Sequence, residues 1–286
     1  MQHRKRGPAR RRLPDHVGVR YGPHPRHLLD AWLPRRDLPT PALIAIHGGG
    51  FRGGDRSVNR LLLRSCLRAG IAVITITYRF SKDALAPAQF HDGARAVQYL
   101  RSRAAEWNIA PDLIAASGES GGGGISLWLA FHADLADAAS QDPVARQSTR
   151  IRGAMSLDGQ TTYDPRVVRE LFPGTDTWRH PALAAMFGLD FDHIEDMPDE
   201  TRTRIEETSP ITHLGPGAAP VLLMHRSEAN APVVDREMGM HHPRFGAMLK
   251  QRMDEVGVRC EIETGVVPGS ECYLALAMEF LERCLR

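Results

Sequence analysis

Residues 113–122 read Leu-Ile-Ala-Ala-Ser-Gly-Glu-Ser-Gly-Gly, an apolar run followed by the pattern Gly-x-Ser-x-Gly around Ser120. The run predicts a buried strand over 113–116, and the glycines and apolar residues beyond it predict a helix over 121–138. A sharp turn between a strand and a helix strains the serine backbone, so the residues two positions away must be glycine to avoid clashes. The turn also places the serine at a helix N-terminus, where the dipole stabilises developing negative charge. The stretch therefore predicts a nucleophilic Ser120.

A second glycine-rich motif, His47-Gly48-Gly49-Gly50-Phe51, follows the apolar run 42–46. An acyl-transfer enzyme must stabilise the oxyanion of a tetrahedral intermediate, and backbone N–H groups do this where the chain can approach the substrate closely. We expect Gly49 and Gly50 to donate from this loop, and Gly121 to donate from the position after the serine. Because each motif follows its own strand, the pair predicts an oxyanion hole rather than a flexible or phosphate-binding loop.

Short apolar runs alternate with longer amphipathic ones along the chain. Strands are predicted at 16–21, 27–33, 42–46, 71–78, 113–116, 154–157, 220–225 and 260–266, and helices at 56–68, 88–107, 121–138, 244–256 and 273–284. This alternation predicts an α/β fold with a mainly parallel central sheet flanked by helices. The segment from about 161 to 217 is rich in proline and has no clear strand, so we expect a cap or lid insertion over the catalytic edge of the sheet.

The composition suits one soluble domain. The chain has 286 residues, of which 42% are hydrophobic and 24% charged, and its formal net charge is +2. This balance selects no nucleic-acid or membrane partner, and no apolar stretch is long enough to span a bilayer. Basic residues crowd the first twelve positions, which predicts a disordered tail over 1–15 and a folded domain over 16–286.

The cysteines point to a reducing compartment. Cys66, Cys260, Cys272 and Cys284 form no Cys-x-x-Cys pair. In a chain of this length, they are expected to be reduced thiols of a cytoplasmic protein.

The motifs HGGGF and, about 70 residues later, GESGG resemble those of the hormone-sensitive-lipase-like and acetyl- or feruloyl-esterase-like branches of the α/β-hydrolase superfamily. The resemblance extends over residues 27 to 285. It implies an α/β-hydrolase fold and a serine carboxylesterase that cleaves small to medium acyl esters through an acyl-enzyme, without metal or organic cofactor. A small-molecule ester is then the partner, and homo-oligomerisation stays open. Two alternatives are a degenerate hydrolase that binds a ligand without turnover, and an amidase or peptidase on the same fold.

The catalytic histidine is harder to place. The resemblance implies a histidine after the last strand, but the last histidine of this chain is His242, and the final loop offers only Ser270 and Glu271. Loops at the carboxyl ends of parallel strands face the nucleophile, so the loop after strand 220–225 is the best source of a base. We expect His242, which lies closest to the start of the next helix, with His241 and His225 as alternatives. His180 and His193 in the insertion are weaker candidates.

The carboxylate that would orient the catalytic histidine is also ambiguous in the sequence. Glu228 lies near the position at which the resemblance implies an acid, and is the first choice; Asp235, Asp158 and Glu271 are the alternatives. Acidic residues cluster over 190–200, and carboxylate oxygens are the ligands that calcium prefers. Their spacing matches no calcium-binding loop, so we expect a solvated cap surface there. The sequence thus predicts Ser120, His242 and Glu228 as the catalytic residues, with no bound metal.

Overall fold

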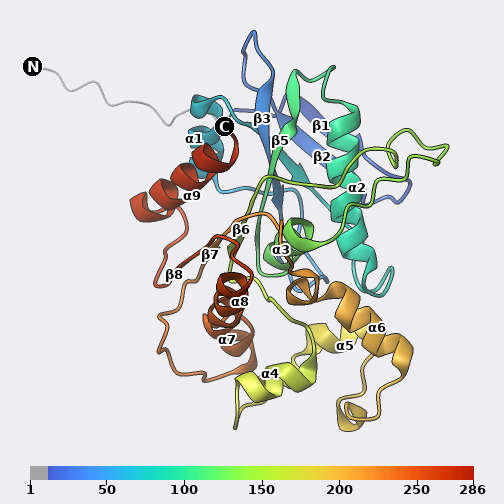
Figure 1. Cartoon of the computed structure of the whole chain (residues 1–286), viewed down its shortest axis with the longest axis vertical. Coiled ribbons are helices and arrows are strands. Elements are labelled where there is room, and N and C mark those ends of the chain that lie inside the picture. The colour runs from blue at the N-terminus through green and yellow to red at the C-terminus, as the bar shows by residue number, and fades with distance from the viewer. Residues whose placement is uncertain (1–11) are drawn as a thin grey trace, which may run out of the picture.

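The computed structural model describes residues 12–286, and these residues form one eight-stranded sheet in the order β1-β2-β4-β3-β5-β6-β7-β8 (Figure 1). The first two strands pair in antiparallel fashion, β2 also pairs antiparallel with β4, and all strands from β3 onward are parallel. The strands are β1 (His16–Arg20), β2 (Leu28–Trp32), β3 (Thr40–Ile46), β4 (Ala72–Ile76), β5 (Ile109–Glu119), β6 (Ala154–Leu157), β7 (Val221–Met224) and β8 (Cys260–Glu263). The central strands are buried on both faces, which explains their continuous apolar sequences.

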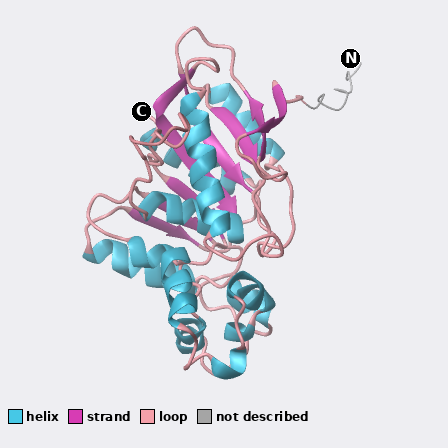
Figure 2. Cartoon of the chain, turned by 90° about the vertical axis from the view of Figure 1, so that its right-hand side faces the viewer, coloured by secondary structure: helices cyan, strands magenta, loops and turns pink. Residues whose placement is uncertain are grey.

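Helices cover both faces of the sheet (Figures 1 and 2). One face is packed by α1 (Arg60–Ala69) and α9 (Glu271–Cys284), whose buried side chains join those of the strands in one apolar cluster. The opposite face is packed by α2 (Ala88–Ser102), α3 (Gly121–Phe131) and α8 (Arg244–Glu255), which form the larger cluster. The predicted α/β-hydrolase fold is confirmed.

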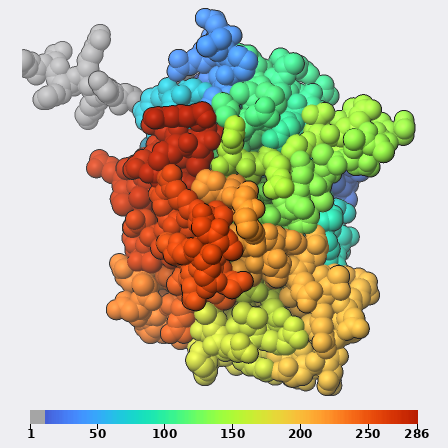
Figure 3. All heavy atoms as spheres, viewed as in Figure 1, coloured from blue at the N-terminus to red at the C-terminus, as the bar shows by residue number. Residues whose placement is uncertain are grey.

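The chain between β6 and β7 folds as a group of short helices at one end of the molecule, the lower end in Figure 3. They are α4 (Pro165–Leu171), η1 (Thr177–Arg179), α5 (Pro181–Phe187), η2 (Phe191–His193), α6 (Asp199–Thr208) and η3 (Pro210–His213). Three of the segment's prolines occupy the first turn of α4, α5 and η3, where a missing N–H costs nothing. We call the segment from α4 to η3 the cap.

Several element boundaries differ from the sequence predictions: helix α2 ends at Ser102 rather than at 107, and strand β5 covers Ile109–Glu119 rather than 113–116. Helix α3 ends at Phe131 rather than near 138, because His132 has extended backbone angles. Helix α1 begins at Arg60, since the Asn59 side chain accepts hydrogen bonds from the next two free amides and caps the helix there. A short helix, α7 (Arg236–Met240), was not predicted at all.

The predicted basic tail falls mainly on residues 1–11, which lie outside the described residues. Within residues 12–286, no helix combines the length and apolar character that a membrane crossing requires.

Candidate active site

Ser120 sits at the turn between β5 and α3, with φ 49° and ψ −121°, a conformation that L-residues rarely adopt. The turn closes tightly around the glycines on either side. A Cβ on Gly118 would lie 2.2 Å from the Gly122 carbonyl oxygen, and a Cβ on Gly122 would lie 2.2 Å from the Ile46 carbonyl oxygen. Both contacts are with backbone atoms that cannot move aside, so this turn requires glycine at both positions. The nucleophile-elbow geometry that the sequence predicts is present.

The second glycine motif lies across from the serine. Gly49 and Gly50 have φ values of 110° and 57°, and their loop is held by amides of residues 52 and 53 that donate to the Gly49 carbonyl. The amides of Gly49, Gly50 and Gly121 donate no hydrogen bond to any acceptor in residues 12–286. Gly49, Gly50 and Ser120 together line a cavity of about 220 Å³. Free donors beside a nucleophile are what an oxyanion hole requires.

The imidazole that faces Ser120 is that of His241. Its Nε2 lies 2.8 Å from Ser120 Oγ, within hydrogen-bond reach. His241 directly follows α7, whose start is fixed by the Asp235 carboxylate accepting the Met238 amide at 2.7 Å. The short helix after β7 therefore carries the imidazole back over the carboxyl edge of the sheet, to the serine at the end of β5.

A carboxylate approaches the other nitrogen of this imidazole. Glu237 Oε1 lies 3.4 Å from His241 Nδ1, and Glu237 Oε2 lies 3.0 Å from His180 Nε2 in the cap. The His180 Nδ1 accepts the Ala182 amide at 3.2 Å, so its proton is on Nε2 and points at Glu237. One oxygen of the Glu237 carboxylate therefore faces His241, and the other faces His180 of the cap. Ser120, His241 and Glu237 form a serine–histidine–acid chain.

The predicted position of the base is corrected from His242 to its neighbour. His242 is buried, with Nε2 donating to the Ala231 carbonyl at 3.0 Å and Nδ1 accepting the Arg244 amide at 3.1 Å. Both ring nitrogens of His242 are bonded to the backbone, so neither is free to accept the proton of Ser120. His242 fixes the connection between α7 and α8.

The predicted position of the acid is corrected as well. Glu228 is exposed in the loop after β7, and its side-chain contact is with Thr264 Oγ1 at 3.4 Å, not with His241. Asp235 is occupied as the cap of α7, and Glu271 is an exposed residue in the first turn of α9.

Asp158 and His225 are placed near each other but not at the serine. Asp158 is buried and binds Arg226, whose guanidinium also donates to Glu119 at 2.7 Å. The His225 Nδ1 lies 3.8 Å from Asp158, and burial lowers the pKa of His225, so the imidazole is held neutral beneath the loop. Arg226 neutralises Asp158, which therefore has no role in orienting His241.

One sequence signal points to the observed pair. Glu237 and His241 are four residues apart, the spacing that places two side chains on the same face of a helix. The helix that makes this spacing meaningful has only five residues, too few for a periodic apolar pattern to reveal it. His180 gives no such signal, because its contact with Glu237 joins positions 57 residues apart.

Comparisons with known proteins identify the family of the chain. A family model called BD-FAE matches residues 29–237. The probable carboxylic ester hydrolase LipM of Mycobacterium tuberculosis is 27% identical over 221 residues, which cover 75% of this chain and 48% of LipM. The carboxylic ester hydrolase LipN of the same organism is 30% identical over 154 residues, 53% of this chain and 36% of LipN. The chain spans half or less of the length of these curated relatives.

Solved structures agree in fold. A truncated carbohydrate esterase from gut microbiota superposes with a TM-score of 0.72 at 22% identity, covering 93% of this chain and 94% of the other. Thermogutta terrifontis esterase 2, phosphonylated by sarin, gives 0.71 at 20% identity and 96% coverage of both chains. These likenesses show an α/β-hydrolase fold. Since the family model also matches most of the sequence, the chain belongs to the BD-FAE family.

Proposed function

We propose that the protein is a carboxylic ester hydrolase in which Ser120 is the nucleophile, His241 the general base and Glu237 the acid that orients it. The observation that supports this most strongly is the 2.8 Å contact between Ser120 Oγ and His241 Nε2 at a strained strand-to-helix turn. Strain at a single serine is costly and persists where function requires it. The named activities of the relatives point to the same reaction.

The reaction follows from the geometry. Ser120 Oγ attacks the ester carbonyl carbon while His241 Nε2 takes the hydroxyl proton, and Glu237 stabilises the imidazolium that forms. The developing oxyanion accepts N–H bonds from Gly49, Gly50 and Gly121. His241 then gives its proton to the departing alcohol, leaving an acyl-serine. A water molecule, deprotonated by the same imidazole, attacks the acyl carbon; the bond to Ser120 Oγ breaks, the imidazolium returns its proton to Oγ, and the acid product leaves.

The cavity supports small to medium acyl groups as substrates. Its walls include the cap residues Ala182, Leu183 and Met186 and the α7 residue Met240, all buried, beside the serine. Arg52, Glu119 and Gln160 supply polar groups on the remaining walls. A partly apolar cavity of about 220 Å³ beside the serine suits a short acyl chain rather than an extended lipid.

The ligand-binding alternative was motivated by the missing histidine after the last strand. That argument weakens once His241 is seen beside Ser120, because a pure binding protein needs neither a base at hydrogen-bond distance nor free oxyanion donors. An amidase reaction uses the same groups and is the second candidate; ester and anilide substrates with the same acyl group separate the two. A cytoplasmic location stays part of the proposal, supported by four free cysteines.

The test measures hydrolysis of p-nitrophenyl acetate and butyrate by the purified chain and compares it with three variants: Ser120→Ala, His241→Gln and the control His193→Gln. His193 is an exposed cap histidine paired with Asp190, away from the cavity. We expect the parent and the control to be active, and Ser120→Ala and His241→Gln to lose at least about 1,000-fold in kcat, as removal of a triad member does elsewhere. Equal activity of the parent and Ser120→Ala would overturn the proposal.

A further inference from the structure

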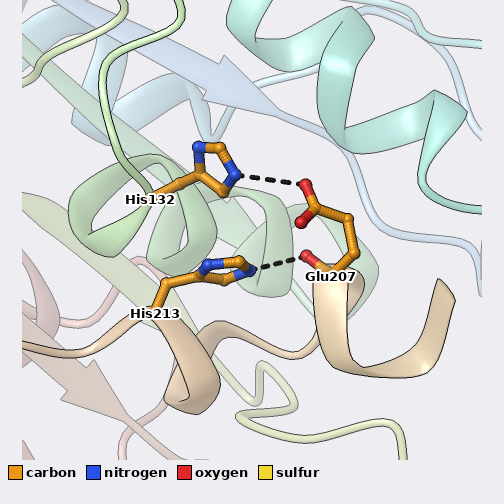
Figure 4. Close-up of side chains that lie close together, drawn as sticks. All are labelled: His132, Glu207 and His213. Carbon is orange, nitrogen blue, oxygen red and sulfur yellow. Dashed lines mark hydrogen bonds and ion pairs between the residues drawn. The ribbon is translucent and has the colours of Figure 1, made fainter. Parts of the chain in front are cut away.

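A cluster of imidazoles surrounds Glu207 on the side of the cap that faces α2 and α3 (Figure 4). His132 ends α3, Glu207 lies in α6, and His213 ends η3; one donor atom from each lies within 4.8 Å of the others. His91 in α2 adds a fourth group, with its Nε2 3.6 Å from Glu207 Oε1. No residue of this cluster lines the cavity at Ser120.

The proton positions around His132 leave a place for a cation. His132 Nδ1 lies 2.8 Å from the Ala133 carbonyl, so Nδ1 carries the proton of the neutral ring. The lone pair is then on Nε2, which lies 3.1 Å from Glu207 Oε1. The Nε2 lone pair and the carboxylate oxygen therefore lie side by side, as two donors to one metal ion do. A ring N–H given to a backbone carbonyl is also the usual way in which a metal-binding histidine is oriented.

The surroundings allow the other donors to turn toward an ion. The Glu207 carbonyl accepts N–H bonds from both His213 Nε2 and Trp128 Nε1, each at 2.7 Å. If His213 turns its nitrogen to an ion, Trp128 still satisfies this carbonyl. Donors around a tetrahedral zinc with bonds of about 2.1 Å lie about 3.4 Å apart, so donors spaced by up to 4.8 Å have to approach by up to about 1.4 Å through side-chain rotation.

We propose that His132, Glu207 and His213 form a site for a divalent transition metal, with zinc as the ion that imidazole and carboxylate donors suit best. The bound ion would tie α6 and η3 of the cap to His132 at the end of α3, the helix that begins at Ser120. Its role is to hold the cap on the core, and no step of ester hydrolysis uses it.

The experiment uses the full chain without a histidine tag, treated with EDTA and dialysed. Zinc chloride is then added at pH 7.5, with calorimetry for affinity, elemental analysis for stoichiometry and thermal unfolding for stability. His132→Phe keeps the ring that stacks on Trp128 at 4.0 Å but removes both nitrogens, and Glu207→Gln keeps the shape of the side chain. His193→Ala, which removes an exposed histidine paired with Asp190, is the matched control.

We expect the parent and His193→Ala to bind one zinc with Kd of about 10 µM or tighter, and to gain several degrees in Tm at about 100 times Kd. His132→Phe and Glu207→Gln should weaken binding at least about 100-fold and lose the Tm gain, while zinc-free ester hydrolysis stays unchanged. Absence of zinc binding by the parent overturns the proposal. Binding that survives both substitutions and inhibits hydrolysis also overturns it, since the ion would then lie at His180 and His241.

Discussion

Replacing Glu237 by glutamine tests the acid assignment, because the change removes the charge and keeps the shape. Glu237 Oε1 lies 3.4 Å from His241 Nδ1, and the Glu237 side chain is 70% exposed. Unit charges about 4 Å apart interact by about 1 kcal/mol in water and about 4 kcal/mol at the dielectric of a protein surface. The high exposure favours the lower part of this range, and we take about 1.4 to 2.3 kcal/mol for stabilisation of the imidazolium.

This energy corresponds to a fall in kcat of about 10-fold to 50-fold, well short of the roughly 10,000-fold loss seen where the acid of a triad is buried. The amide adds a second defect. His180 directs its Nε2 at one oxygen of Glu237 and His241 Nδ1 lies near the other, so glutamine can offer an oxygen to one of these histidines and only an NH₂ group to the other. Glu237 and His180 also line the cavity, so KM is measured alongside kcat; glutamine keeps the size of the side chain, and we expect the larger change in kcat.

The assay is steady-state hydrolysis of p-nitrophenyl butyrate, with Glu228→Gln as the matched control. Glu228 is the acid that the sequence favoured, and it lies in the exposed loop after β7 without contact to His241. The control should keep its kcat within about twofold of the parent. The assignment is refuted if Glu237→Gln retains full kcat, or if Glu228→Gln loses as much.

Three further predictions concern the elbow, the cap and acid stability. Gly122→Ala places a Cβ 2.2 Å from a backbone oxygen, so we expect loss of the folded enzyme or of all esterase activity, measured by circular dichroism and hydrolysis; an active, stable variant contradicts the elbow geometry. His180→Asn keeps an N-cap for α5 but withdraws the contact with Glu237, so kcat should fall about 3-fold to 10-fold at unchanged Tm; an unchanged kcat removes His180 from the site. Burial raises the pKa of Asp92, but bonds from His27 and Arg79 outweigh this effect, so the pKa in the folded protein lies below its ordinary value of 3.8. The stability that Asp92 contributes is therefore present above pH 3.8 and is lost as the pH falls through the pKa of the folded state. Urea midpoints should therefore differ between the parent and Asp92→Asn at pH 6 and converge toward pH 3, and a constant difference argues against this ion pair.

The sequence predicts the sheet well because each central strand is a continuous apolar run. A parallel strand that is buried on both faces requires apolar residues at nearly every position. The elbow is predictable for a similar reason. Gly118 and Gly122 are separated from Ser120 by one residue on each side, and their backbone contacts leave no alternative to glycine. Local steric demands of this kind are visible in a few consecutive residues.

Which histidine and which carboxylate lie beside Ser120 depends on tertiary structure that a short stretch of sequence does not reveal. His241 and His242 are adjacent, and which of them faces the serine is decided by where α7 ends. A helix of five residues has no stable periodic signal of its own, and it exists because Asp235 caps it and neighbouring elements pack on it. The proximity of His180 to Glu237 depends on how the cap folds back, a tertiary arrangement that no local pattern specifies.

The central claim is that His241 activates Ser120. The most direct measurement is the rate at which a fluorophosphonate modifies the serine, followed by intact-mass and peptide mass spectrometry in the parent, His241→Gln and His193→Gln. We expect one adduct per chain on Ser120, formed at equal rates in the parent and His193→Gln and at least about 100-fold more slowly in His241→Gln. Equal rates in the parent and His241→Gln, or an adduct on another residue, would contradict the account.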